Sequence, residues 1–60
     1  MTEEQRTELL KRLDALTDAD QEHSHSEADD ILCDALLLCG EVQIAEAWRA
    51  ARRRIGFWYA

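Results

Sequence analysis

The sequence contains no proline and only two glycines, at positions 40 and 56. Both residue types interrupt helices, so their scarcity leaves room for long uninterrupted helical segments. With 47% apolar residues, the chain is too apolar for a disordered polypeptide, and it shows neither a strand pattern nor an internal repeat. We therefore predict an all-α fold in one domain, residues 1–60.

Long apolar runs are also missing. The longest, ALLLC, is far shorter than the roughly 20 residues of a membrane span. The first residues, MTEEQRTELL, lack the apolar stretch of a signal peptide. Only two cysteines occur, Cys33 and Cys39, about 9 Å apart along a helix and too distant for a disulfide within it. We expect a cytoplasmic protein without membrane contact, with two reduced and mostly buried thiols.

Acidic residues are absent from the last 14 positions, and the charge is therefore uneven. Residues 1–46 hold all 13 acids and three bases, whereas residues 47–60 hold four arginines, within a net charge of −6. An acidic total argues against direct nucleic-acid binding, which depends on neutralising phosphates. The split predicts salt bridges between these arginines and the acids of the middle segment, within or between chains.

Three helices are predicted, at residues 2–16, 18–39 and 41–55, followed by an aromatic tail at 56–60. Short connections favour antiparallel neighbours, so the fold class is an all-α, small antiparallel helical bundle with two to three helices per chain. A chain of this length buries only about 60% of its unfolded surface, and small scaffolds often need a partner subunit. We expect a homo-oligomer to complete the bundle.

The helix ends carry recognisable signals. Thr2 and Gln5 fit a capping box at the first helix. The second helix begins between Asp18 and Ser24, because Ser24-His25-Ser26-Glu27 is another possible capping box. Gly40 and Gly56 are expected to end the second and third helices in the left-handed conformation.

Apolar residues at helical spacing are expected to face the core. They are Leu9, Leu10, Leu13 and Leu16 in the first helix, Ala28, Ile31, Leu32, Ala35, Leu36, Leu38 and Cys39 in the second, and Ile44, Ala45, Trp48, Ala51 and Ile55 in the third. Leu37 falls near the polar face of the second helix, so it is expected to be an exposed contact point.

The segment DQEHSHSEADD, residues 20–30, places two histidines among carboxylates. His23 and His25 point about 200° apart on a helix and cannot share one metal ion. His25 and Asp29 extend the core stripe, with Glu22 one turn earlier. The favoured interpretation is a buried His25–Asp29 hydrogen bond that holds helices together.

A metal site formed by Glu22, His25 and Asp29 is the less favoured alternative. Zinc needs three or four ligands, and one chain offers three at most. No nucleophile lies beside a base, and no phosphate-binding loop is present. We therefore assign no catalytic residue, no metal and no cofactor, and an enzyme is not the favoured function.

Arg49, Arg52 and Arg53 lie near the aromatic residues Trp58 and Tyr59 in the sequence. The guanidinium group of arginine binds phosphate through paired hydrogen bonds, and aromatic rings stack on bases, so these residues could bind a small anion such as a nucleotide. Salt bridges to the second helix are the favoured alternative. The aromatic tail is expected to fold back near the histidine segment or to dock on a neighbouring chain.

The pattern D-x-E-x-x-H-x-E-A-D-D-I-L-C, with a later glycine-ended helix and a final WYA, resembles a group of short proteins encoded by bacteriophages and prophages. The resemblance covers residues 20–60, about two thirds of the chain. The matching positions are Asp20, Glu22, His25, Ala28, Asp29, Gly40, Trp58, Tyr59 and Ala60. Many of these proteins have a lysine where this chain has Phe57, which puts the match of the tail in doubt. The resemblance implies a phage-related helical protein in the bacterial cytoplasm and names no reaction.

The leading hypothesis is a small accessory protein that binds a protein of the bacterial host, with anti-defence activity as one form of that role. Its contact surface would be the acidic face of the second helix or the arginine and aromatic patch. The alternatives are an oligomeric module for a small anionic ligand, a metal-dependent hydrolase using Glu22, His25 and Asp29, and a DNA mimic that presents carboxylates in place of phosphates.

Overall fold

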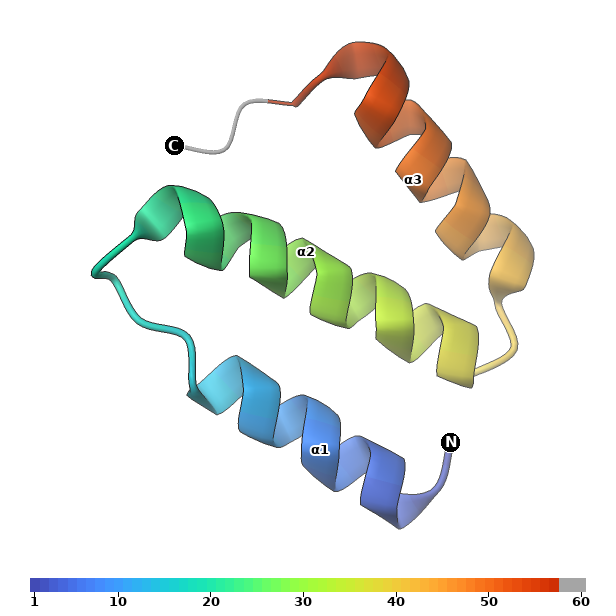
Figure 1. The fold of residues 1–60 in the computed structure, drawn as a ribbon. Coiled ribbons are helices and arrows are strands. Elements are labelled where there is room, and N and C mark those ends of the chain that lie inside the picture. Colours follow the sequence, from blue (N-terminus) through green and yellow to red (C-terminus); the bar gives the residue numbers. More distant parts are fainter. Residues whose placement is uncertain (58–60) are drawn as a thin grey trace.

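Three helices make up the computed structural model, which describes residues 1–57. They are α1 (Glu3–Asp14), α2 (Gln21–Leu38) and α3 (Val42–Ile55). Consecutive helices run antiparallel, with α2 in the middle and α1 and α3 on its two sides (Figure 1). The predicted all-α class and the order of three helices are confirmed, and each helix is slightly shorter than expected.

The helices form a single layer. The Cα atoms extend over 32 × 30 × 7 Å, so the molecule is about as thick as one helix. Both outer helices pack on α2, and α1 and α3 do not contact each other within residues 1–57 (Figure 1). The helices therefore do not close around a common core, and both broad faces of the layer remain open.

The start of α2 is fixed by Asp20. Its side chain accepts a hydrogen bond from the backbone N–H of His23 at 3.0 Å, so the helix begins at Gln21. Ser24 has another role: its hydroxyl donates to the carbonyl of Thr17 at 2.7 Å and ties the loop to the first turn of α2. The capping box predicted at Ser24 is therefore not the helix start.

Other predicted helix signals are confirmed. The backbone N–H of Gln5 donates to the Thr2 hydroxyl at 3.1 Å, and the Gln5 side chain accepts from the Thr2 N–H at 2.8 Å. Gly40 and Gly56 have φ angles of +84° and +68°, which residues with a Cβ atom rarely adopt. Both glycines stand where a helix stops and the chain turns, as expected.

Within residues 1–57, four apolar residues are buried, Leu9, Ile31, Cys33 and Ala45. Ile31 shares a stripe of α2 with Glu27 and Leu38, which face α1. Cys33, about 200° further round the helix, faces α3 and donates its thiol to the Ala45 carbonyl at 3.7 Å. The interior thus consists of two thin seams, one on each side of α2.

Several predicted core residues are exposed instead, among them Leu10, Leu32, Cys39, Ile44 and Ile55. The prediction assumed one buried stripe per helix, but α2 has a neighbour on each flank. Its buried positions are therefore split between those flanks, and the apolar stripe between them is open. For the same reason Cys33 is buried and Cys39 exposed, and neither cysteine forms a disulfide.

None of α1, α2 and α3 is both long enough and apolar enough to cross a membrane, a finding that covers residues 1–57.

Candidate functional site

Asp34 of α2 joins all three helices. Its Oδ2 accepts a hydrogen bond from Nη1 of Arg12 in α1 at 3.0 Å, and its Oδ1 lies 3.6 Å from Nη2 of Arg49 in α3. Arg12 also lies 3.6 Å from Glu27. These side chains are about one third exposed, so the charges are partly screened by water but held in defined positions.

A second cross-helix pair lies further along α2. Nη1 of Arg52 donates to Oδ1 of Asp30 at 3.0 Å. The predicted salt bridges between the arginines of α3 and the acids of α2 are therefore confirmed within one chain for Arg49 and Arg52. Arg53 is exposed and forms no ion pair with any residue among 1–57. We call the side carrying Arg12, Asp30, Asp34, Arg49 and Arg52 the ionic face.

The ion pairs raise the pKa of Arg12. The hydrogen bond that Arg12 donates to Asp34 contributes most to the raised pKa, partial burial opposes it, and Glu27 adds to the increase. When the folded chain raises the pKa of a basic group, the pairing of that group stabilises the fold fully at a pH below the group's pKa in the unfolded chain. This stabilisation is lost only as the pH rises through the group's pKa in the folded chain. Both values lie far above neutrality, so Arg12 stays charged and does not act as a pH switch near neutral pH.

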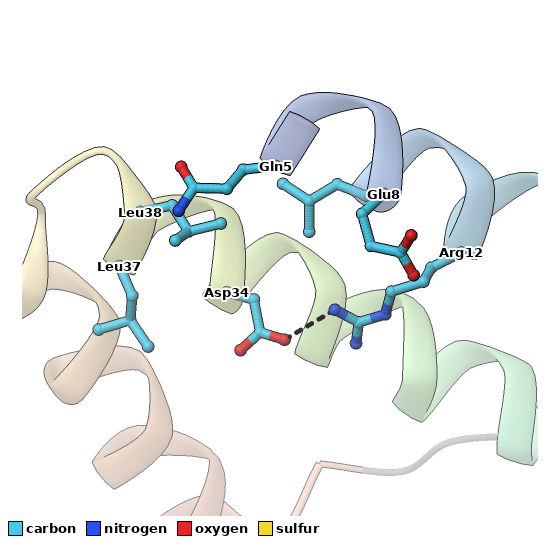
Figure 2. A pocket seen from close by; sticks show the side chains of 7 residues that line it. Gln5, Glu8, Arg12, Asp34, Leu37 and Leu38 are labelled. Atoms are coloured by element: carbon cyan, nitrogen blue, oxygen red, sulfur yellow. Dashed lines mark hydrogen bonds and ion pairs between the residues drawn. The ribbon is translucent and has the colours of Figure 1, made fainter. Parts of the chain in front are cut away.

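A hollow of about 340 Å³ opens between α1 and α2 beside Asp34 (Figure 2). Its walls are formed by Gln5, Glu8, Leu9, Arg12, Asp34, Leu37 and Leu38. Leu37 is half-buried here, so it is not the fully exposed contact point that its place on the helix predicted. The leucines provide apolar surface, and the polar side chains of Gln5, Glu8, Arg12 and Asp34 stand around it (Figure 2).

The histidine segment contains a pair of neighbouring side chains, His25 and Asp29. Nε2 of His25 lies 3.8 Å from Oδ2 of Asp29, one helical turn away. The His25 side chain is 51% exposed and that of Asp29 is 20% exposed. The predicted buried clasp is therefore wrong for His25, because neither α1 nor α3 covers this side of α2. His23 is exposed, as expected, and Glu22 lies in a shallow hollow with Asp20, His23 and Ser26.

Metal-ligating side chains do not converge in the part of the chain that is described. Among residues 1–57, no three His, Cys, Asp or Glu side chains form a group that could hold a metal ion. Glu22, His25 and Asp29 share one side of α2, but they do not form such a group. Within the described residues, His25 and Asp29 therefore form a pair of side chains but not a set of metal ligands.

The aromatic tail begins with Phe57, which stacks on Trp48 of α3. The two ring centroids are 5.4 Å apart and the ring planes are 19° from parallel. Phe57 therefore packs on the helix that precedes it, and the predicted docking of the tail near His25 and Asp29 stays a prediction. The predicted site residues Trp58 and Tyr59 lie outside the described residues.

Sequence reasoning did not find the α1 contribution to this site. Arg12 and Glu8 were not assigned a role, although Arg12 binds the acid that also binds Arg49. One signal could have found it: an antiparallel α1 places its basic last turn, Lys11 and Arg12, beside the acidic half of α2.

Comparison with protein-family models finds no matching family, and comparison with curated proteins and with solved structures finds no similar protein.

Proposed function

We propose that the chain is a small phage-type accessory protein that acts by binding a protein of the bacterial host. The observation that carries the proposal is the hollow between α1 and α2, in which apolar leucine surface is surrounded by fixed charges. Strong protein–protein contacts often place an apolar side chain in such a setting, with polar groups at the rim excluding water. The resemblance to phage-encoded proteins supports a host protein as the partner, with anti-defence activity as one outcome of binding.

The ionic face would orient that partner. Glu8 is an exposed carboxylate at the hollow, whereas Arg12 and Asp34 neutralise each other. A partner segment with an apolar anchor and a nearby basic group therefore fits better than an acidic one. Charge complementarity of this kind adds specificity and speeds association more than it adds affinity.

The alternative of a small anionic ligand receives less support from this geometry. Arg49 lies beside Asp34 and Arg52 donates to Asp30, so two of the three arginines assigned to phosphate already contact carboxylates. Freeing them would cost the interactions that hold α3 to α2. The hydrolase alternative is not supported by a cluster of metal ligands, because no three His, Cys, Asp or Glu side chains within residues 1–57 come together to hold a metal ion.

The proposal is tested by Leu37→Asp, with Leu37→Met as the matched control. A charge at this half-buried wall should abolish binding of the partner, because the partner's apolar group would have to desolvate a carboxylate. Methionine keeps an apolar side chain of similar volume and should preserve binding. The measurement is affinity capture from host lysate, with captured proteins quantified by mass spectrometry.

A host protein that is captured by the unchanged chain and by Leu37→Met, and lost with Leu37→Asp, supports the proposal. Circular dichroism of both variants checks that the helices are intact. Capture that is equal for all three proteins would place the contact elsewhere, and no specific capture by the unchanged chain would contradict the proposed function.

A further inference from the structure

The two broad faces of the layer differ in chemistry. In α2, Asp30 and Asp34 define the ionic face, and Leu32, two residues from each of them, lies about 160° from both around the helix. In α1, Leu10 lies about 200° from Arg12. Leu32 and Leu10 therefore point to the side opposite the ionic face. Their helices, α2 and α1, lie next to each other (Figure 1).

The same reasoning places apolar residues of α3 on that side. Ile44 and Ile55 lie about 140° and 120° from Arg49 around the helix. With Leu13 of α1, the large apolar side chains on this side come from all three helices. We call Leu10, Leu13, Leu32, Ile44 and Ile55 the apolar face; they are 55%, 36%, 60%, 55% and 58% exposed, respectively.

We infer that the apolar face is covered by a second copy of this chain. Five large aliphatic side chains, none charged, are spread over a layer of 32 × 30 Å. That span can supply the roughly 800 Å² per partner of a standard-size interface. Soluble monomers rarely leave a contiguous apolar patch of that size in water.

A second copy fits better than a different protein for two reasons. First, residues 1–57 bury only four apolar residues among themselves, so the fold needs cover, and other copies of the chain are always present. Second, the five aliphatic side chains carry no charge, so a two-fold axis near Leu32 would bring mainly apolar groups into contact, although His25 and Asp29 lie on the same side of α2. Two such layers would form the two-layer packing that small domains usually have within one chain.

The inference also explains the helical spacing of these residues. Leu10, Leu32 and Ile44 occupy positions that are typical of a buried stripe, yet one chain leaves them open. In the dimer, Leu32 of the middle helix would lie near the centre of the interface, and the outer helices would flank it. The inference does not rest on the proposed host partner, because the hollow beside Leu37 is on the other side of the layer.

The test is the mass of the full chain in solution, measured by sedimentation equilibrium. The unchanged chain should show twice its mass of 6.9 kDa. Leu32→Glu should weaken self-association roughly 100-fold or more, because two carboxylates would be buried in apolar surroundings. The matched control is Val42→Glu: Val42 is 45% exposed and about 200° from Ile44, so it lies off the apolar face, and the dimer should remain.

The behaviour of Leu32→Glu and Val42→Glu shows whether the apolar face forms a dimer interface. A helical monomer for Leu32→Glu beside a dimer for Val42→Glu supports the inference. Unfolding of Leu32→Glu alone also supports it, because a side chain that one chain leaves 60% exposed would then matter only in an assembly. A monomeric unchanged chain, or an assembly that survives Leu32→Glu, overturns it.

Discussion

At the scale of single residues, Asp34 of α2 pairs with arginines of both outer helices. It contacts Arg12 and Arg49 and so links helices that do not touch each other. Asp30 has one described partner, Arg52, at the same 3.0 Å distance that separates Asp34 from Arg12. The two carboxylates therefore provide a comparison of one pair with a bridged network on the same face of one helix.

Asp30→Asn and Asp34→Asn should both destabilise the fold, and Asp34→Asn should do so more. Loss of the single partly exposed pair at Asp30 is expected to cost about 0.5 kcal/mol. Loss of Asp34 removes contacts to both outer helices at once. Urea unfolding followed by circular dichroism gives both values. Because salt screens such pairs, the difference between the variants should shrink in 1 M NaCl; equal midpoints at low salt would show that the bridge adds nothing.

At the scale of the elements, the sequence predicted the helices well and their burial less well. The Thr2 cap, the two glycines and the apolar spacing are local signals, and local signals determine where helices form. Burial depends on which elements become neighbours. Leu32 belongs to the predicted core stripe, and both cysteines are expected to be mostly buried; because α2 lies between two helices, it buries Cys33 but leaves Leu32 and Cys39 exposed. No spacing within α2 reveals that it has a neighbour on each flank.

The start of α2 is the element-scale feature that a mutation tests most directly. Asp20→Ala removes the acceptor for the His23 N–H and should lower the free energy of unfolding by about 1 kcal/mol. Asp20→Ser keeps a capping oxygen and should recover most of that loss. Ser24→Ala removes a hydrogen bond to the Thr17 carbonyl but no cap. If Ser24→Ala were the more damaging change in chemical denaturation, the helix would start at Ser24.

At the scale of the whole molecule, a layer one helix thick determines both the proposed contacts and the stability. The salt bridges between α2 and α3 could be expected from the charge split of the sequence, whereas the hollow could not. It requires Leu9 of α1 and Leu38 of α2 to meet, and these residues are 29 positions apart in a chain whose helices could have packed in several ways. The opposite characters of the two faces likewise appear only once the order α1, α2, α3 is known.

A thin layer should depend strongly on its few buried side chains, and Ile31, at 1% exposure, is the largest fully buried side chain within residues 1–57. Ile31→Ala should cost about 2–5 kcal/mol, and Ile31→Val about 1 kcal/mol. A domain of this size has only a few kcal/mol in reserve, so Ile31→Ala should unfold at low concentration while Ile31→Val remains helical. Thermal circular dichroism of both variants measures the difference.

Repeating that experiment at several protein concentrations distinguishes the stability of the single chain from the stability gained by dimer formation. If folding is coupled to dimer formation, raising the concentration of Ile31→Ala should restore helix, and the melting temperature of Ile31→Val should rise with concentration. The reason is mass action: a dimer that forms only from folded chains draws the unfolded chains back. Melting temperatures that do not change over a 100-fold concentration range would mean that each layer is stable alone, with the free energy of folding residing in the two seams beside α2.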